Sequence, residues 1–353
     1  MRKTFSRRDV LAGSGAVALG LASTRVVSAA PPATPVTPQL IEAAKKEGKV
    51  IYYTSVDLPL AEKVAKAFEA RYPGIAVRVE RTGAERVFQR IGQEYTSRIY
   101  AVDVVNSSDA AHFIVWRRDG ILQPYVPEDV AKYYPKEHQD AEGLFASFRI
   151  GLSVIAYNTN LVKAEDAPKS FADLLDPKWA GKICKAHPGY SGTIMTATFQ
   201  IVRDLGWDYL EKLAKQRVMQ LQSSTDPPKK LALGERAIEA DGNEYNIFQI
   251  KESGGPVEPV YATEGTPLVV GPNGIFKNAP NPNAARLFQS FCFSAECQQL
   301  ISDAGGQRSV HPGVHEKPGR KPFKDVKTMK EDAAGVDKMG EEIKARYSRI
   351  FKV

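Results

Sequence analysis

The chain has 353 residues, of which 48 are lysine or arginine and 41 are aspartate or glutamate, giving a formal charge of +7. Residues 1–29 carry +4 of that charge, so the remainder holds only about +3 and has no basic run interleaved with aromatics, which argues against a nucleic-acid-binding protein. The length favours two lobes over a single core, and the three cysteines lack the spacing of a zinc site.

Residues 1–29 have the layout of a cleaved export signal. Arg7 and Arg8 precede a short Gly/Ala-rich apolar run, and small residues follow at positions 27–29. Paired arginines are typical of the twin-arginine class, which carries folded cargo. The apolar run is short for a membrane span, and a retained anchor is the alternative. We therefore expect the mature chain in the periplasm.

The next part of the chain alternates strands and helices. The patterns predict a helix over 39–47, a strand at 50–53, a helix up to residue 72, a strand at 75–79, a helix from Thr82, a strand at 103–105 and a helix ending near residue 120. Three successive strand-helix units predict a mainly parallel sheet. Ligands of such sheets bind at the carboxyl ends of the strands.

Hydroxyl and carboxyl side chains follow these strands. The candidates for binding are Thr54, Ser55, Thr82, Ser107, Ser108 and Asp109. Because the carboxyl ends of parallel strands share one edge, these side chains are expected to converge on one cleft. Ser, Thr and Asp are also the ordinary residues that cap helix N-termini, so a purely structural role is the alternative for each of them.

A second strand-helix series occupies residues 158–258. The run at 147–157 is long enough to cross between lobes. After it we expect a strand at 182–186, helices at 193–205 and 207–215, a strand at 219–223, a helix that holds Leu231, Leu233 and Ile238, and a strand edge at 245–247.

A return crossing over 263–276 leads to two helices within 279–301 that come back to the first lobe. We therefore expect lobe one at 38–148 plus 260–312 and lobe two at 150–258 plus 313–353, with a solvated basic loop at 315–327. Two crossings form a hinge. Cys292 and Cys297 form either a disulfide or two buried thiols.

The stretch 157–193 carries three consecutive motifs. YNT begins it, SFADLLDPKWAGKI follows, and PGYSGT ends it. This order resembles the extracellular solute-binding proteins of ABC importers, in the ferric-ion-binding-protein-like group. The resemblance implies an α/β, two-lobed type II periplasmic-binding-protein fold, each lobe being a mainly parallel sheet flanked by helices. It also implies an inner-membrane ABC permease as the partner, and we expect a monomer without cofactors.

The last motif places Ser191, Gly192 and Thr193 at the start of a helix. Free backbone N–H groups and the helix dipole favour an anion there. In the family that the chain resembles, ligand contacts come from this turn and from the turns of the first lobe. The same residues also resemble a nucleophile elbow, but the final glycine is missing and only His311 and His315 follow, in a loop-like stretch. We therefore expect no enzyme.

Iron carriers of this group hold Fe³⁺ with adjacent tyrosines, because phenolate is a hard anionic donor. Residues 243–247 contain one tyrosine, Tyr245, where two would be expected. Tyr245 is either a ligand contact through its hydroxyl or an edge-strand aromatic. Iron binding is therefore the alternative, and we expect no metal site.

Arg86 lies four residues after Thr82, near the start of its helix. A cation there either stays solvated, pairs with Glu85 or Asp109, or faces an anion, for which the planar guanidinium is well matched. We expect a small organic anion, such as a carboxylate, phosphonate or phosphate ester, to bind between the lobes to Arg86 and the residues named above.

Overall fold

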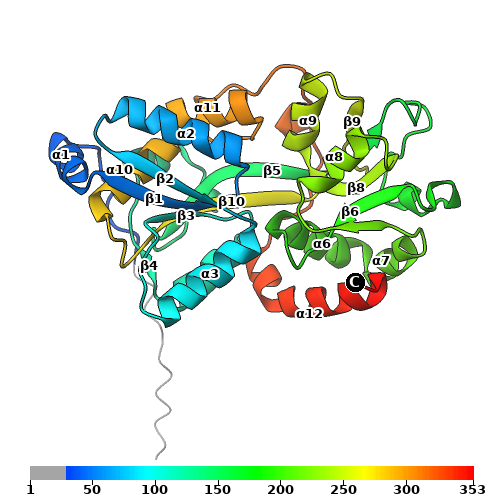
Figure 1. Cartoon of the computed structure of the whole chain (residues 1–353), viewed down its shortest axis with the longest axis horizontal. Coiled ribbons are helices and arrows are strands. Elements are labelled where there is room, and N and C mark those ends of the chain that lie inside the picture. Colours follow the sequence, from blue (N-terminus) through cyan, green and yellow to red (C-terminus); the bar gives the residue numbers. More distant parts are fainter. Residues whose placement is uncertain (1–28) are drawn as a thin grey trace, which may run out of the picture.

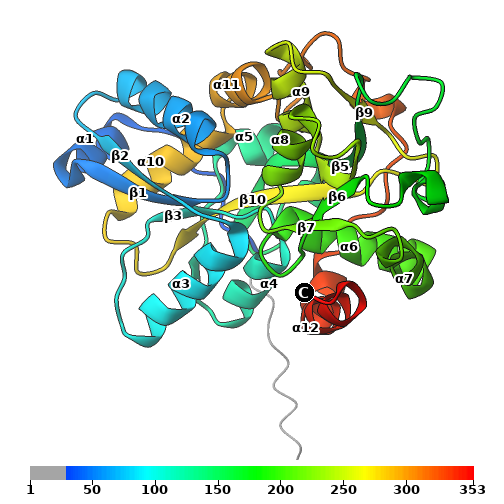
Figure 2. The same cartoon turned by 45° about the vertical axis from the view of Figure 1, so that its right-hand side comes forward.

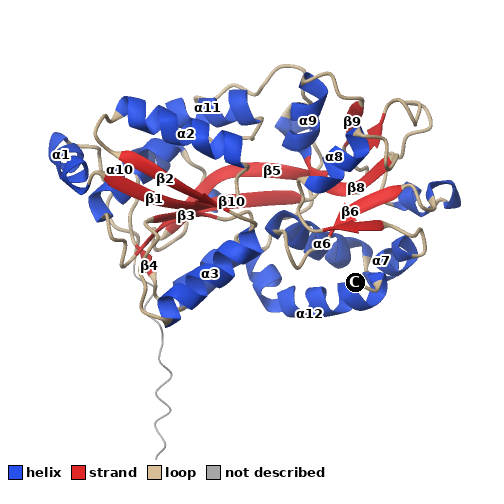
Figure 3. Cartoon of the chain, in the orientation of Figure 1, coloured by secondary structure: helices blue, strands red, loops and turns tan. Residues whose placement is uncertain are grey.

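The computed structural model describes residues 29–353, so the predicted export signal lies almost entirely outside the described residues. A central layer of strands is covered on both faces by helices (Figure 3). The strands and helices form two halves that meet along two long central strands, β5 Phe145–Asn158 and β10 Leu268–Phe276 (Figure 1). This mixed α/β architecture is the fold class that we predicted.

The first half is built around β1, β2, β3 and β10. Its elements are α1 Pro38–Glu47, β1 Lys49–Thr54, α2 Leu58–Arg71, β2 Ala76–Arg81, α3 Ala84–Thr96, β3 Val104–Asn106, α4 Ala111–Arg118, β4 Leu122–Gln123, α5 Glu128–Tyr133, β10, α10 Pro282–Phe293 and α11 Ala295–Gly305. β1 pairs in parallel with β2 and β3, whereas β10 runs antiparallel to β3 and β5. The expected strand-helix units of this region are confirmed.

The second half repeats this plan. Its elements are β6 Ile183–Ala186, α6 Gly192–Leu205, α7 Trp207–Ala214, β7 Met219–Leu221, α8 Asp226–Ala232, β8 Ile238–Asn243, α9 Glu244–Glu252, β9 Val257–Val260 and α12 Ala333–Phe351. β6 is parallel to β7 and β8, and β5 is antiparallel to β8 and β9. A short 3₁₀ turn, Ala172–Leu175, precedes β6.

β5 belongs to both halves. Its residues from Phe145 to Leu152 pair with β10, and those from Ser153 to Asn158 pair with β8 and β9. The strands therefore form one continuous path in the order β2-β1-β3-β10-β5-β8-β6-β7, whereas we expected a separate sheet in each lobe. One strand of 14 residues is long enough to serve different partners along its length. The sheet by itself therefore does not demonstrate a hinge.

Two local predictions were wrong. Ile238 begins strand β8 and is not part of the preceding helix, which ends at Ala232, just before the left-handed Gly234 with φ 74°. Tyr245 lies in the first turn of helix α9 and not at a strand edge. In both places a short apolar run was assigned to the wrong element, because such runs do not distinguish a strand from a buried helix by periodicity.

Each half has its own hydrophobic core. The larger one, around Phe68 and Phe288, lies between β1, α2 and α10, and the other surrounds Phe171 and Leu210 in the second half. All three cysteines are buried free thiols, so Cys292 and Cys297 are not joined by a disulfide. No helix among residues 29–353 is long and apolar enough to cross a membrane.

The C-terminal helix α12 joins the two halves. It packs on α6 and α7, and it also contacts α4 of the first half. Figure 2 shows it below α6, on the same side of the sheet as α3 and α4. A small apolar cluster formed by Ala111, Met195, Phe199, Val336 and Ile343 fills the space between these helices.

Candidate functional site

A small polar cavity lies between the two halves. The space left between its side chains is about 20 Å³, enough for about one water molecule. The lining residues from the first half are Ser55, Arg81, Gly83, Ala84, Ser108 and Arg149, and those from the second half are Tyr190, Ser191, Thr193, Ser223, Ser224, Thr225, Asn243 and Tyr245. We call this space the inner cavity. Seven of its lining residues carry an aliphatic hydroxyl and none is acidic, so hydrogen-bond donors and positive charge dominate.

Three helices begin at the inner cavity. Gly83 and Ala84 start α3, Ser191 caps α6, and Tyr245 lies in the first turn of α9. Neither α3 nor α9 has a side chain that caps its N-terminus. Their first backbone N–H groups therefore lack an intrahelical acceptor, and all three helix dipoles place partial positive charge at this point.

Arg149 is the buried cation of the inner cavity. It lies on β5, is 5% exposed, and donates one hydrogen bond from its Nη1 to Gln307 Oε1 at 3.3 Å, while its Nε has no partner. The side chain lies over Gly271 of β10, where a Cβ would come within 3.0 Å of the guanidinium group. Burying a charge with an unused donor is unfavourable unless an acceptor arrives. Arg149 is therefore available to an anion in the cavity.

Arg81 supplies a second cation. It is the last residue of β2, and its Nε donates to the backbone oxygen of Val56 at 3.2 Å. This hydrogen bond fixes the guanidinium group beside the cavity and leaves its two amino groups for other acceptors. Arg81 and Arg149 are the two cations that line the cavity, and the carboxylate of Asp57 lies close enough to both for their charges to act on its pKa.

Tyr245 contributes a hydroxyl group. It is 5% exposed and lines the inner cavity from the second half. Burial, and then the negative charge of Asp57, raises the pKa of Tyr245 to about 12. The phenol therefore stays protonated at neutral pH and acts as a hydrogen-bond donor.

The structure brings together five of the eleven residues singled out from the sequence. Ser55, Ser108, Ser191, Thr193 and Tyr245 all line the inner cavity. Two of them are also hydrogen-bonded to each other: the backbone N–H of Ser108 donates to Ser55 Oγ at 2.9 Å. The expectation that the strand-end turns converge with the turn at 188–193 therefore agrees with the geometry.

The other six residues do not line this cavity. Thr54 Oγ1 accepts a hydrogen bond from the backbone of Val56, and Ser107 Oγ contacts His112 Nδ1 at 2.9 Å. Asp109 Oδ1 accepts from the backbone of Ala111. These three side chains shape their turns, but none of them caps a helix, because the N-cap positions of α2 and α4 belong to Asp57 and Ala110.

Gly192, Thr82 and Arg86 also differ from expectation. A Cβ on Gly192 would meet Asp109 Cβ at 2.7 Å, so this glycine permits the close approach of the two halves. Thr82 is half-buried beside the cavity without lining it, and Arg86 is exposed. The side chain of Arg86 faces outward because the first turn of α3 directs Ala84 and Val87 inward instead.

Sequence reasoning missed Arg81, Arg149 and the segment 223–225. Arg149 was visible as a charged residue inside the apolar run FRIGLSVIAY, which is unusual for a buried strand. The strand β7 is followed by Ser223, Ser224 and Thr225, just as β1 is followed by Ser55. In the first lobe, hydroxyl side chains that follow a strand were taken as binding candidates, and the same criterion applied to these three residues. Arg81 directly precedes Thr82.

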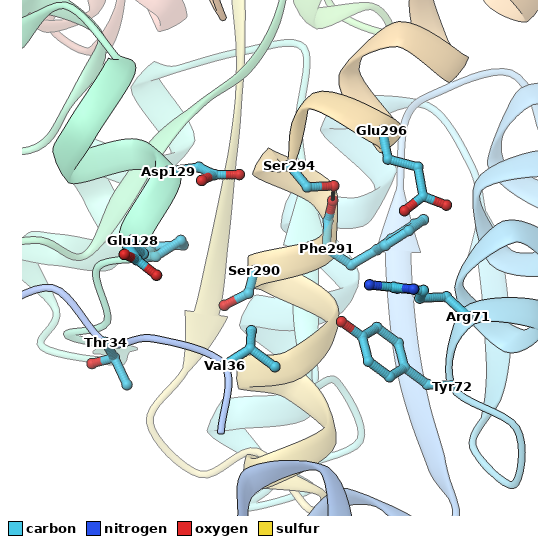
Figure 4. Close-up of a pocket in the computed structure, with 11 residues that line it drawn as sticks. Thr34, Val36, Arg71, Tyr72, Glu128, Asp129, Ser290, Phe291, Ser294 and Glu296 are labelled. Carbon is cyan, nitrogen blue, oxygen red and sulfur yellow. Dashed lines mark hydrogen bonds between the residues drawn. The ribbon is translucent and has the colours of Figure 1, made fainter. Parts of the chain in front are cut away.

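A second cavity, of about 210 Å³, lies wholly within the first half (Figure 4). Glu128 and Asp129 lie on one side of it and Arg71 and Tyr72 on the other. Three carboxylates, including that of Glu296, line it beside one arginine. It therefore lacks the excess of donors found in the inner cavity. No group of three or more His, Cys, Asp or Glu side chains within residues 29–353 is arranged to hold a metal ion.

A family model described as bacterial extracellular solute-binding protein matches residues 102–328. Iron uptake protein A1 of Synechocystis is 25% identical over 289 residues, covering 76% of each chain. A probable ABC transporter periplasmic-binding protein of Sinorhizobium fredii is 23% identical and covers 70% of each chain.

Solved structures share the fold. The periplasmic binding protein AfuA from Actinobacillus pleuropneumoniae, with fructose-6-phosphate bound, superimposes with a TM-score of 0.79 at 26% identity, covering 87% of this chain and 99% of that one. Iron-bound HitA from Pseudomonas aeruginosa gives a TM-score of 0.74 at 22% identity, covering 85% and 99%.

Proposed function

Because this chain belongs to the bacterial extracellular solute-binding proteins, which deliver small solutes to ABC permeases and are not enzymes, we propose that it captures a small organic anion in the inner cavity. The observation that supports the anion most directly is Arg149, a buried arginine whose Nε has no partner. The complete absence of acidic side chains from the described lining agrees with this assignment.

A phosphate ester or phosphonate suits the cavity better than a monocarboxylate. Two guanidinium groups balance two negative charges, and three tetrahedral oxygens can accept from several of the hydroxyl and backbone donors at once. AfuA, whose structure contains fructose-6-phosphate, is a relative with this kind of ligand. Each charge-assisted hydrogen bond contributes roughly 1.5–3 kcal/mol, so three or four of them reach micromolar affinity after the cost of ordering.

The ligand enters when the two halves separate. The inner cavity has room for about one water molecule, so an organic anion requires a wider separation of the halves than the one described. The chain passes between the halves at β5 and at 261–267. We assign both the boundary between the lobes and the hinge to these two crossings. The protein works as a periplasmic monomer that is exported by the twin-arginine route.

A thermal-shift screen tests the proposal. The panel contains inorganic phosphate, fructose 6-phosphate, a simple alkyl phosphonate, citrate, fructose and Fe³⁺. A ligand at one hundred times its dissociation constant adds about 2.7 kcal/mol of stability. We expect at least one phosphorylated or phosphonate compound to stabilise the protein. Stabilisation by fructose or by a cation, with no effect of any anion, would contradict the proposal.

Ferric iron is the second candidate. Tyr190 and Tyr245 both line the inner cavity, and the relatives include an iron uptake protein. Against iron, no carboxylate or histidine among the described residues lines the inner cavity beside these tyrosines. Iron bound by phenolates gives a visible charge-transfer band. Such a band in the purified protein with Fe³⁺, lost in Tyr245→Phe, would establish the iron function.

A further inference from the structure

The C-terminal helix α12 is anchored on the second half. Tyr347 is fully buried in the core of that half, and its hydroxyl donates to Gln220 Oε1 at 2.8 Å. Arg346 lies over the ring of Trp207 at 4.4 Å and pairs with Glu211 of α7 at 3.2 Å. Because these contacts hold α12 on the second half, the helix is expected to move with that half when the two halves separate.

The same helix braces the turn 187–191, part of which lines the inner cavity. Ser348 Oγ lies 3.1 Å from Nε2 of His187, and Nδ1 of that imidazole accepts a hydrogen bond from the backbone N–H of Gly189 at 2.9 Å. The rings of His187 and Tyr347 meet edge to face with their centroids 4.9 Å apart. The position of α12 and the shape of this wall of the cavity therefore depend on each other.

Two ion pairs join α12 to the first half. Lys344 Nζ lies 3.0 Å from Glu85 Oε1, and Asp337 Oδ2 lies 3.1 Å from Arg118 Nη1. Glu85 belongs to the first turn of α3, the helix that begins at the inner cavity. Ala111 of α4 adds an apolar contact, because it packs in the cluster that α12 forms with α6. The helix therefore spans the boundary between the halves on the side of the sheet where α3 and α4 lie (Figure 2).

Separation of the halves must break these two ion pairs. The cationic and acidic partners on α12 stay with the second half, whereas Glu85 and Arg118 lie on helices of the first half. We propose that α12 is a latch whose two ion pairs hold the halves together and lower the fraction of molecules that is open to a solute. This inference rests on the separation of the halves in the proposed function, and it does not depend on which solute binds. A weaker latch shifts the population towards the open form, so a solute must supply more of the free energy of closure.

The reaction of a thiol placed in the inner cavity measures the open fraction. Ser224 is 7% exposed, lines the cavity from the second half and differs from cysteine in one atom. In Ser224→Cys, modification by N-ethylmaleimide requires the halves to separate, so its rate follows the open fraction when opening is fast. Adding Lys344→Met and Asp337→Asn should raise this rate about threefold or more, because each partly exposed ion pair makes a modest contribution to the closed form. Mass spectrometry of peptides gives the rate at each cysteine.

Two controls separate opening of the halves from other effects. Glu211→Gln breaks the ion pair that α12 makes within the second half, and it should change the rate less than about twofold. The fully buried Cys292 and Cys297 report unfolding, and their rates should be the same in all variants.

The outcomes distinguish the latch from the separation of the halves. The latch is overturned, and the separation stays intact, if the latch variant reacts less than about threefold faster than Ser224→Cys alone. An equal rise in Glu211→Gln, or an equal rise at Cys292, also overturns the latch. If the introduced thiol reacts no faster than Cys292 in Ser224→Cys, the halves do not separate, and the proposed mode of ligand entry fails together with the latch.

Discussion

Lys344 of α12 and Glu85 of α3 form an ion pair between the two halves, with Nζ 3.0 Å from Oε1. The side chains are 28% and 13% exposed, so solvent screens this pair only in part. The other carboxylate oxygen of Glu85 lies 3.6 Å from Nε2 of His112, whose Nδ1 contacts Ser107 beside the inner cavity. Arg118 and Asp337 make a second such pair at 3.1 Å. Two ion pairs therefore connect the C-terminal helix α12 to α3 and α4 of the first half.

Glu85→Gln should reduce the stability of the protein in a pH-dependent way. Burial alone would raise the pKa of Glu85, but the hydrogen bond and charge of His112, and then Lys344, lower it to about 2. A carboxylate with a lowered pKa stabilises the fold above its unfolded pKa, near 4.5, and loses this contribution as the pH falls towards 2. We expect a loss of about 1 kcal/mol at pH 6, measured by urea unfolding.

The control is Glu341→Gln, because Glu341 also contacts Lys344 at 3.0 Å but is 91% exposed. The free energy of unfolding of Glu341→Gln should differ from that of the parent by no more than a few tenths of a kcal/mol. A loss in Glu85→Gln that is the same at pH 3 and pH 6 would show that the ion pair is not its source.

Arg149→Lys should weaken binding of the best anion from the screen. Lysine keeps the charge but loses the planar group that reaches several acceptors, so we expect a loss of about tenfold or more. Titration calorimetry measures it. Arg86→Ala is the matched control, because Arg86 is an exposed arginine of the nearby helix α3. An equal loss of affinity in both variants would show that Arg149 does not bind the anion.

Lys185→Met should strongly destabilise the second half. Lys185 pairs with Asp241, and both side chains are 1% exposed. Burial lowers the pKa of Lys185 and raises that of Asp241, which disfavours the charged form of both groups. The attraction between the two groups opposes this effect of burial. Removing one partner of a buried pair costs about 3–5 kcal/mol, whereas Lys185→Met combined with Asp241→Leu should recover most of it. Urea unfolding measures both variants, and a single variant as stable as the parent would contradict this.

The three cysteines should resist thiol reagents in the folded protein. Cys184, Cys292 and Cys297 are all fully buried, and burial raises the pKa of the Cys184 and Cys292 thiols. Only the thiolate reacts readily. Titration with Ellman's reagent should find almost no reactive thiol before unfolding and three afterwards. Fewer than three after unfolding without reductant would indicate a disulfide.

Replacing Arg7 and Arg8 with lysine should block export. The twin-arginine route reads this pair, and the general secretory route does not require it. Immunoblots of periplasmic and cytoplasmic fractions measure the outcome, with Lys3→Arg as the control for a change of basic residue elsewhere in the leader. Unchanged periplasmic delivery would point to the general secretory route.

The spacing of apolar residues and the residues typical of turns were enough to predict most strands and helices. They also predicted the turns that carry Ser55, Ser108, Ser191 and Thr193. Each of these turns begins a helix after a strand, and that signal lies within a few neighbouring residues. The three motifs of residues 157–193 also predicted the family. These features depend on short-range chemistry, which is why the sequence alone determined them.

Only the tertiary structure decided which charged groups meet. Arg86 looked well placed along the chain, but its position on the helix turns it to solvent, while Arg149 arrives from the middle of a crossing strand. Asp57 and Arg149 are far apart in sequence and near each other in the cleft. The direction in which a side chain points depends on the packing of the whole element, and neighbouring residues in the chain do not encode that packing.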